Sequence, residues 1–290
     1  MTEAPSSLEN SIQNLEMLLI SEGVKRDNVN WIIDWIRKQK SPERSRGLIG
    51  VATAFVKNKN VEPALEILEF VESSTEREYA LHTSRKYSLY GEIAEILAWR
   101  GEIDKAERII DKISPSEEVV EDSEEDVERS LACVRVAPAI GKHQSVPEAE
   151  RYIEEMISLS ADKFLAYGLL ALIVAENKGF QSGMKYIEEK LKGDKDGYWK
   201  RVAYDKLFFR ALSGKLVYLR KNEELSFDDL KKYFLKLDPS SQGYILTKII
   251  ERTERMKEEL ASKIERLIES ANIQIRLKNL CRLELGSKIE

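Results

Sequence analysis

Cysteine and histidine are scarce: the 290 residues include two cysteines, Cys133 and Cys281, and two histidines, His82 and His143. Two cysteines cannot build a disulfide framework, and neither stands in a C-x-x-C pair. A zinc site would need these four residues to converge without any of the usual ligand spacings. We therefore expect no disulfide framework, no metal and no cofactor.

Catalytic motifs are also missing. The sequence has no glycine-rich phosphate loop, no G-x-S-x-G turn, no H-E-x-x-H and no EF-hand loop. Cys133 and His143 are ten residues apart on one predicted helix, which is about 15 Å at 1.5 Å per residue and too far for a nucleophile and its base. We expect a protein that is not an enzyme.

Long apolar runs are absent as well. No stretch of 18 apolar residues exists, and the N-terminus has no basic segment of the signal-peptide type. We expect a cytoplasmic protein with no membrane segment. Glutamine is sparse while Glu, Lys, Arg and Ile are abundant, a usage typical of thermophilic proteins.

What the sequence has is helical periodicity from end to end, with few prolines inside the periodic segments. Start signals recur, such as the capping boxes of Ser145 with Glu148 and Ser226 with Asp229. Helices are predicted at 8–22, 27–39, 43–58, 61–73, 76–100, 102–113, 124–141, 146–160, 162–178, 180–192, 197–221, 227–237, 242–270 and 272–285.

One residue register repeats four times. Counted from the first residue of each repeat, apolar or large residues stand at offsets 0, 3, 7 and 20, and a small residue stands at offsets 4 and 16. The four segments are Leu48, Val51, Ala52, Phe55, Ala64, Leu68; Tyr90, Ile93, Ala94, Leu97, Ala106, Ile110; Cys133, Val136, Ala137, Ile140, Ala149, Ile153; and Tyr167, Leu170, Ala171, Val174, Gly183, Ile187. Offsets 0, 3, 4 and 7 form one stripe on a first helix, and offsets 16 and 20 lie on a second helix after a short turn.

Small residues at offsets 4 and 16 would let the two helices of a pair approach closely, since a packed core tolerates little added volume. This pattern resembles the tetratricopeptide repeat (TPR) family over residues 44–192, with alanine in place of the family's glycine. The resemblance implies an all-α fold, a right-handed superhelix of antiparallel helix pairs. An irregular helical bundle whose helices match by chance is the alternative.

Three segments are expected on this basis. Residues 1–42 form a helix pair that is a cap or a divergent repeat, residues 43–192 form four TPR-like pairs, and residues 193–290 form divergent repeats with a long capping helix. Trp199, Val202 and Ala203 begin another register that Lys206 breaks. An acidic run at 117–128 is either a solvated loop or a contact for a basic partner.

TPR proteins usually bind peptides on the concave face lined by the first helices, so the resemblance predicts a groove that binds a partner helix or peptide. Its predicted residues are Arg46, Ile49, Thr53, Val56, Lys57, Glu95, Trp99, Leu131, Val134 and Leu172. Apolar residues prevail in this groove, and a large exposed apolar surface is costly. A partner helix, a second subunit or the chain's own 242–270 helix would cover it.

The charge is unevenly divided. Residues 192–290 hold 22 Lys and Arg against 16 Asp and Glu, a net charge of +6, whereas residues 1–191 hold 24 against 35, a net charge of −11. Basic residues beside aromatics can hold phosphates and stack bases. The alternative function is therefore nucleic-acid binding, through Lys215, Arg220, Lys221, Lys231, Lys232 and Tyr233.

Overall fold

The computed structural model describes residues 38, 43–71, 77–113, 124–213, 225–252 and 258–288, and these residues form thirteen α-helices and no strand. The all-α fold class is therefore confirmed. The helices predicted at 8–22 and 27–39 lie outside the described residues, apart from residue 38. Within the described part of the chain, no helix is long and apolar enough to cross a membrane.

The chain divides into two compact units, one ending at His143 and the other beginning at Gln144. The first unit contains α3 (Glu43–Lys57), α4 (Val61–Leu68), α5 (Arg77–Trp99), α6 (Ile103–Ile110) and α7 (Glu124–His143). The second contains α8 (Val146–Met156), α9 (Ser160–Lys178), α10 (Phe180–Lys190), α11 (Tyr198–Leu212), α12 (Phe227–Lys236), α13 (Pro239–Arg252), α14 (Glu258–Ser270) and α15 (Ile275–Gly286).

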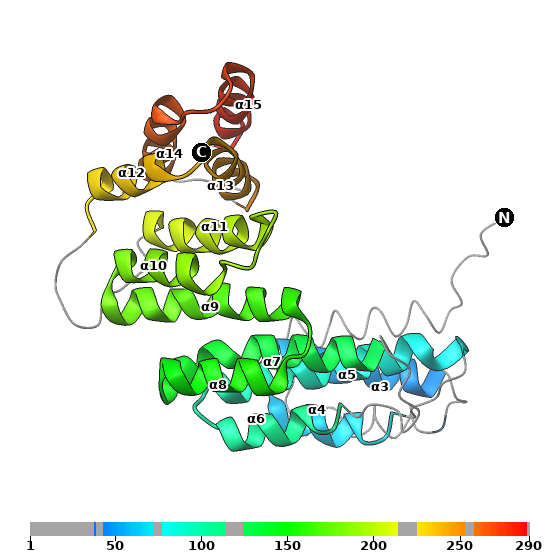
Figure 1. The fold of residues 1–290 in the computed structure, drawn as a ribbon. Coiled ribbons are helices and arrows are strands. Elements are labelled where there is room, and N and C mark those ends of the chain that lie inside the picture. The colour runs from blue at the N-terminus through cyan, green and yellow to red at the C-terminus, as the bar shows by residue number, and fades with distance from the viewer. Residues whose placement is uncertain are drawn as a thin grey trace. The chain divides into compact units, whose positions relative to one another are not determined.

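The first unit has two layers of helices, with α3, α5 and α7 in one and α4 and α6 in the other (Figure 1). α5 and α7 run parallel: Gly91 lies against Ala132, and further along both helices His143 Nε2 lies 3.1 Å from the carbonyl oxygen of Trp99. The short turns after α3 and α5 send α4 and α6 back in the opposite direction. This alternation makes α3–α4 and α5–α6 two helical hairpins.

Two glycines that stand between predicted helices adopt a backbone conformation that ends a helix. Gly101, between α5 and α6, has a φ of 84°, and Gly179, between α9 and α10, has a φ of 96°. Side chains with a Cβ rarely adopt this left-handed region, so glycine is favoured there. The predicted caps are confirmed too, since Ser145 Oγ accepts the amide of Glu148 at 3.2 Å and Ser226 Oγ accepts that of Asp229 at 3.1 Å.

The small residues of the register are buried as predicted. None of the seven alanines has any exposed surface, and Gly183 is buried. At Gly183 the α9–α10 crossing is at its tightest: a Cβ placed there would lie 2.7 Å from the Cβ of Ala175 and 3.0 Å from the carbonyl oxygen of Ala171. The two backbones therefore approach as closely as glycine allows. The seven alanines are Ala52, Ala64, Ala94, Ala106, Ala137, Ala149 and Ala171.

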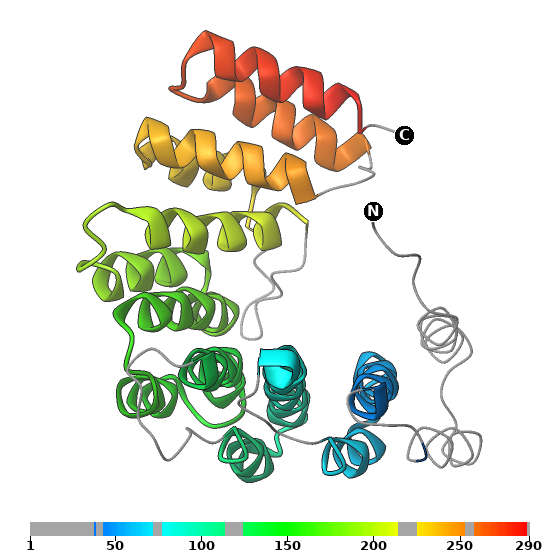
Figure 2. The same ribbon diagram turned by 90° about the vertical axis from the view of Figure 1, so that its right-hand side faces the viewer.

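In the second unit, α9, α11 and α13 form successive parallel rows (Figure 2). Gly168 and Glu176 of α9 face Ala203 and Arg210 of α11, in the same order along both helices. α15 continues the series, because Gly243 near the start of α13 contacts Leu277, and the carbonyl oxygen of Ile250 near its end accepts Lys288 Nζ at 2.8 Å. Helix hairpins therefore extend beyond residue 192, where the sequence register fades.

The single helix predicted at 242–270 is wrong. α13 ends at Arg252, α14 begins at Glu258, and the two helices lie against each other. Ile249 on α13 and Ile264 on α14 both have no exposed surface. One long helix would have left much of this apolar stripe in water, and folding it into two helices buries both halves.

Gly183→Ala is expected to destabilise the second unit by about 1–3 kcal/mol, although alanine normally stabilises a helix relative to glycine, because the added methyl collides with α9. The matched control is Gly286→Ala, since a Cβ at Gly286 meets no atom within 4 Å. Urea unfolding followed by circular dichroism measures both variants. A Gly183→Ala protein as stable as the Gly286→Ala protein would contradict the close crossing.

Candidate partner-binding surface

The predicted groove residues of α3 divide into buried and exposed ones. Ile49, Thr53 and Val56 are at most 8% exposed, while Arg46 and Lys57 are exposed. The Thr53 hydroxyl donates to the carbonyl oxygen of Ile49 at 2.8 Å, within the same helix. Of the predicted groove residues on α3, Arg46 and Lys57 are therefore the ones with well-exposed surface.

The other predicted groove residues show the same division. Val134 on α7 and Leu172 on α9 are buried, whereas Glu95, Trp99 and Leu131 are half-buried. The aliphatic residues that made the predicted groove apolar are thus largely covered by the chain itself. The accessible part of this set is mainly polar or aromatic.

Trp99 lies at the centre of a polar cluster on α5 and α7. Lys142 Nζ is 5.1 Å from the centroid of the Trp99 ring, a cation–π arrangement. Burial raises the pKa of Glu95, and the positive charge of Arg135 opposes this rise, as does a hydrogen bond from the Trp99 side chain. Arg135 Nη1 is buried and has no hydrogen-bond partner, so this cluster holds an unused donor.

In the second unit, α11 presents a different residue to each of its neighbours. The Tyr204 hydroxyl donates to Glu188 on α10, and the Phe208 ring packs edge-on against Phe180 and Phe234, with centroids 5.1 and 5.9 Å away. Ala203 faces α9 and Asp205 faces α13. Only one side of α11 remains without a covering helix among these contacts.

That remaining side carries Lys206. At about 100° per residue, Lys206 lies about 160° around the helix from Tyr204, which faces α10. We call the side of the first helices that points away from the second helices the open face. Lys206 lies on the open face of α11, between the edges that contact α9 and α13.

The register of this fifth pair starts at Tyr204 rather than at Trp199. Gly91, one residue after the register position Tyr90, contacts Ala132, one residue before Cys133; in the same way Gly168, one residue after Tyr167, contacts Ala203. Tyr204 therefore corresponds to Tyr167. The signal available in the sequence was the pair Tyr204 and Leu207, which matches Tyr167 and Leu170; the small residue that should follow is Phe208.

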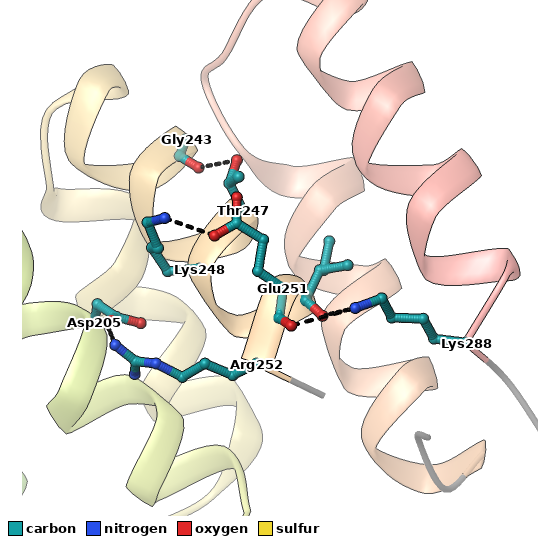
Figure 3. A network of polar contacts seen from close by, with 8 residues as sticks. Asp205, Gly243, Thr247, Lys248, Glu251, Arg252 and Lys288 are labelled. Carbon is teal, nitrogen blue, oxygen red and sulfur yellow. Dashed lines mark hydrogen bonds and ion pairs between the residues drawn. The ribbon is translucent and has the colours of Figure 1, made fainter. Parts of the chain in front are cut away.

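Asp205 anchors the contact between α11 and α13. Its side chain has no exposed surface and forms an ion pair with Arg252 (Figure 3). The Arg252 guanidinium also lies 5.8 Å from the Phe209 ring centroid. Burial raises the pKa of Asp205, and the charge of Arg252 opposes the rise. The second carboxylate oxygen, Oδ1, is buried without a hydrogen-bond partner, so Arg252 is the main compensation for this buried charge.

Lys206 is half-buried and forms no ion pair or hydrogen bond within the described residues. Burial lowers its pKa, the neighbouring charges of Arg252 and Arg210 lower it further, and Asp205 opposes them. Arg210, one turn along α11, is paired with Glu176 on α9. We refer to these five residues, Glu176, Asp205, Lys206, Arg210 and Arg252, as the Lys206 cluster.

Of the residues of the alternative nucleic-acid surface, Lys231, Lys232 and Tyr233 lie in the described part of the chain, next to one another on α12. Lys215, Arg220 and Lys221 lie outside the described residues. Lys232 on α12 is exposed and paired with Asp229 at 3.1 Å. Tyr233 is half-buried, with its ring 5.3 Å from that of Phe180, so part of this aromatic surface is used in packing; Lys231 is half-buried as well.

Comparison with models of known protein families, with curated proteins and with solved structures finds no match for this chain. Within the described ranges, no group of three or more His, Cys, Asp or Glu side chains is placed to hold a metal ion. The described surface offers half-buried cations and aromatic rings, such as Lys206 and Trp99, on helices that packing holds in place.

Arg252→Met is expected to destabilise the chain at pH 7.5, toward the lower end of the about 3–5 kcal/mol typical of breaking a buried ion pair, because Arg252 keeps 37% of its side chain exposed. The pKa of Asp205 is above its ordinary value in the folded chain, so the folded state gains protons first as the pH falls. The loss should therefore shrink between pH 7.5 and 4.5.

Urea unfolding at the two pH values measures this effect. The double variant Asp205→Asn, Arg252→Met is the control, and it should recover most of the loss at pH 7.5, because it leaves no buried charge. An Arg252→Met loss that is the same at both pH values, or that persists in the double variant, would show that the ion pair is not what holds α11 to α13.

Proposed function

We propose that this chain is a non-enzymatic protein-interaction scaffold, a right-handed superhelix of TPR-like helix pairs that binds a helix or peptide of a partner protein along the open face of its first helices. The observation that supports this most directly is the arrangement of the first helices within each unit. In the second unit, α11 contacts α9, α10, α12 and α13, and among the described residues its remaining side, which carries Lys206, has no helix against it.

The second helices support the same proposal from the other side. Tyr204 and Phe208 on α11 are occupied with α10 and α12, so the surface facing them is fully used in packing. Trp99 and Glu95 in the first unit, like Lys206 in the second, keep part of their side chains accessible. Amphipathic segments that bind in helical grooves typically place a few anchors against such residues.

The test is affinity capture from a lysate of the source organism, with the full chain and three variants as bait. Trp99→Glu and Lys206→Glu change the open face, and Lys185→Glu is the control, because Lys185 on α10 keeps 77% of its side chain exposed. Quantitative mass spectrometry should find one set of proteins retained by the native chain and the control, and depleted by both open-face variants.

Light scattering on the purified chain accompanies the capture, because a second copy of the chain is an alternative occupant. A native chain and control that retain no protein lost by the open-face variants, together with a monomeric native chain, would contradict the proposed scaffold. Enzymatic turnover would also contradict it.

A further inference from the structure

Lys206 is a cation that forms no ion pair with any of the described residues. Lysine is rarely buried unless it is paired, because removing an ammonium group from water is costly. The other half-buried lysines of the described residues, apart from Lys231, donate to a carboxylate or a carbonyl oxygen. They are Lys86, Lys163, Lys190, Lys200, Lys248, Lys263, Lys278 and Lys288.

The neighbours of Lys206 do not neutralise it. Asp205 is paired with Arg252 from α13, and Glu176 on α9 is paired with Arg210. Lys248, the other cation of α13 beside Asp205, is paired with Glu251 at 2.6 Å. The Lys206 cluster therefore contains three cations and two carboxylates, and its uncompensated positive charge is on the open face.

The residues on either side of Lys206 limit what it can bind. Val202 and Phe209, one turn before and one turn after Lys206 on the same side of α11, are both half-buried. A ligand group that reaches Lys206 would thus lie beside apolar surface. Asp205, whose charge acts on Lys206, would repel a backbone that carries a phosphate at every nucleotide, whereas a single carboxylate needs only one cation.

We propose that Lys206 is the residue that recognises a side-chain carboxylate in an acidic, amphipathic segment of the partner protein, with Arg210 and Arg252 reinforcing the positive field. This inference rests on the proposed function and specifies its ligand. The apolar residues of the same segment pack against Val202 and Phe209. The partner's carboxylate supplies the negative charge that the described residues do not pair with the Lys206 ammonium group.

Fluorescence anisotropy with defined peptides tests the inference. The probe is a labelled 16-residue helical peptide of Leu and Glu, acetylated and amidated so that only side-chain carboxylates are charged; its partner probe has Gln in place of every Glu. The full chain should bind the Glu peptide about tenfold more tightly than the Gln peptide, as expected for one charge-assisted contact. Lys206→Gln should remove this preference.

Lys231→Gln is the matched control, because Lys231 is also half-buried and has no ion pair among the described residues, but lies on α12. It should keep the full preference for the Glu peptide. Equal loss in both lysine variants, equal affinity for the two peptides, or no binding of either peptide would overturn the inference. Tighter binding of a 16-nucleotide single-stranded RNA than of the Glu peptide would also overturn it and favour nucleic acid.

The outcomes separate this inference from the proposed function. If both peptides bind equally and Trp99→Glu or Val202→Glu weakens both, the open face binds helices without reading charge. The scaffold would then stand, while the role of Lys206 would fail. Affinity capture that finds no partner would instead remove the scaffold itself, whatever the peptides do.

Stability provides a readout that a merely structural lysine would not give. Because Lys206 is half-buried without an ion pair, Lys206→Met should raise the midpoint of urea unfolding at pH 7, whereas binding of the Glu peptide should weaken. A lower midpoint in Lys206→Met would show that the charge is already satisfied in the folded chain, and would overturn the inference.

Discussion

The close approach of paired helices at small residues is the constraint on which the rest of this structure depends. At Gly183 not even a methyl group fits between α9 and α10 without displacing Ala175 or the backbone of Ala171. Helices held this close leave little freedom in their rotation about their axes. Which side chains face the second helices, and which face away, is therefore fixed by packing, and the open face is the geometric consequence.

This constraint explains how much of the fold could be read from the sequence. Alanines such as Ala94 and Ala106 mark a crossing because a larger residue would be excluded there, and their spacing predicted helices that the structure contains as α5 and α6. Where the crossing is built differently, the signal is lost. At α11 the small residue is replaced by Phe208, which packs between Phe180 and Phe234, so the fifth hairpin is hidden from a search for small residues.

The break between α13 and α14 could not be predicted for a related reason. The apolar steps from Ile245 to Ile249 and from Ile264 to Leu267 continue one stripe, and no glycine or proline separates them at 253–257. Periodicity records which side of a helix is buried but not whether the chain reverses direction. That the apolar stripe belongs to two helices becomes evident only from tertiary packing, in which α14 lies against α13 and α12.

The candidate site could not be predicted for the same reason, because sequence periodicity does not show which helices lie against each other. In the sequence, Lys206 is a charge that interrupts an apolar pattern. In the structure, Tyr204 contacts α10 and Asp205 contacts α13, and these two contacts place Lys206 on the open face of α11. The pairing of its neighbours Arg210 and Asp205 cannot be deduced from a single helix, since it depends on Glu176 and Arg252, which are supplied by other helices.

One register position carries a basic residue in α7 and in α11, whereas it holds Gly50, Glu92 and Leu169 in the other first helices. Counted from Cys133 and from Tyr204, the position two residues later is Arg135 in α7 and Lys206 in α11, and both side chains are half-buried. Arg135 keeps a buried Nη1 without a hydrogen-bond partner, and Lys206 keeps an unpaired ammonium group. Apolar side chains at these positions would avoid the cost of desolvating a charge. Under the proposed function, a carboxylate of the partner segment would supply the acceptor that Lys206 does not find among the described residues.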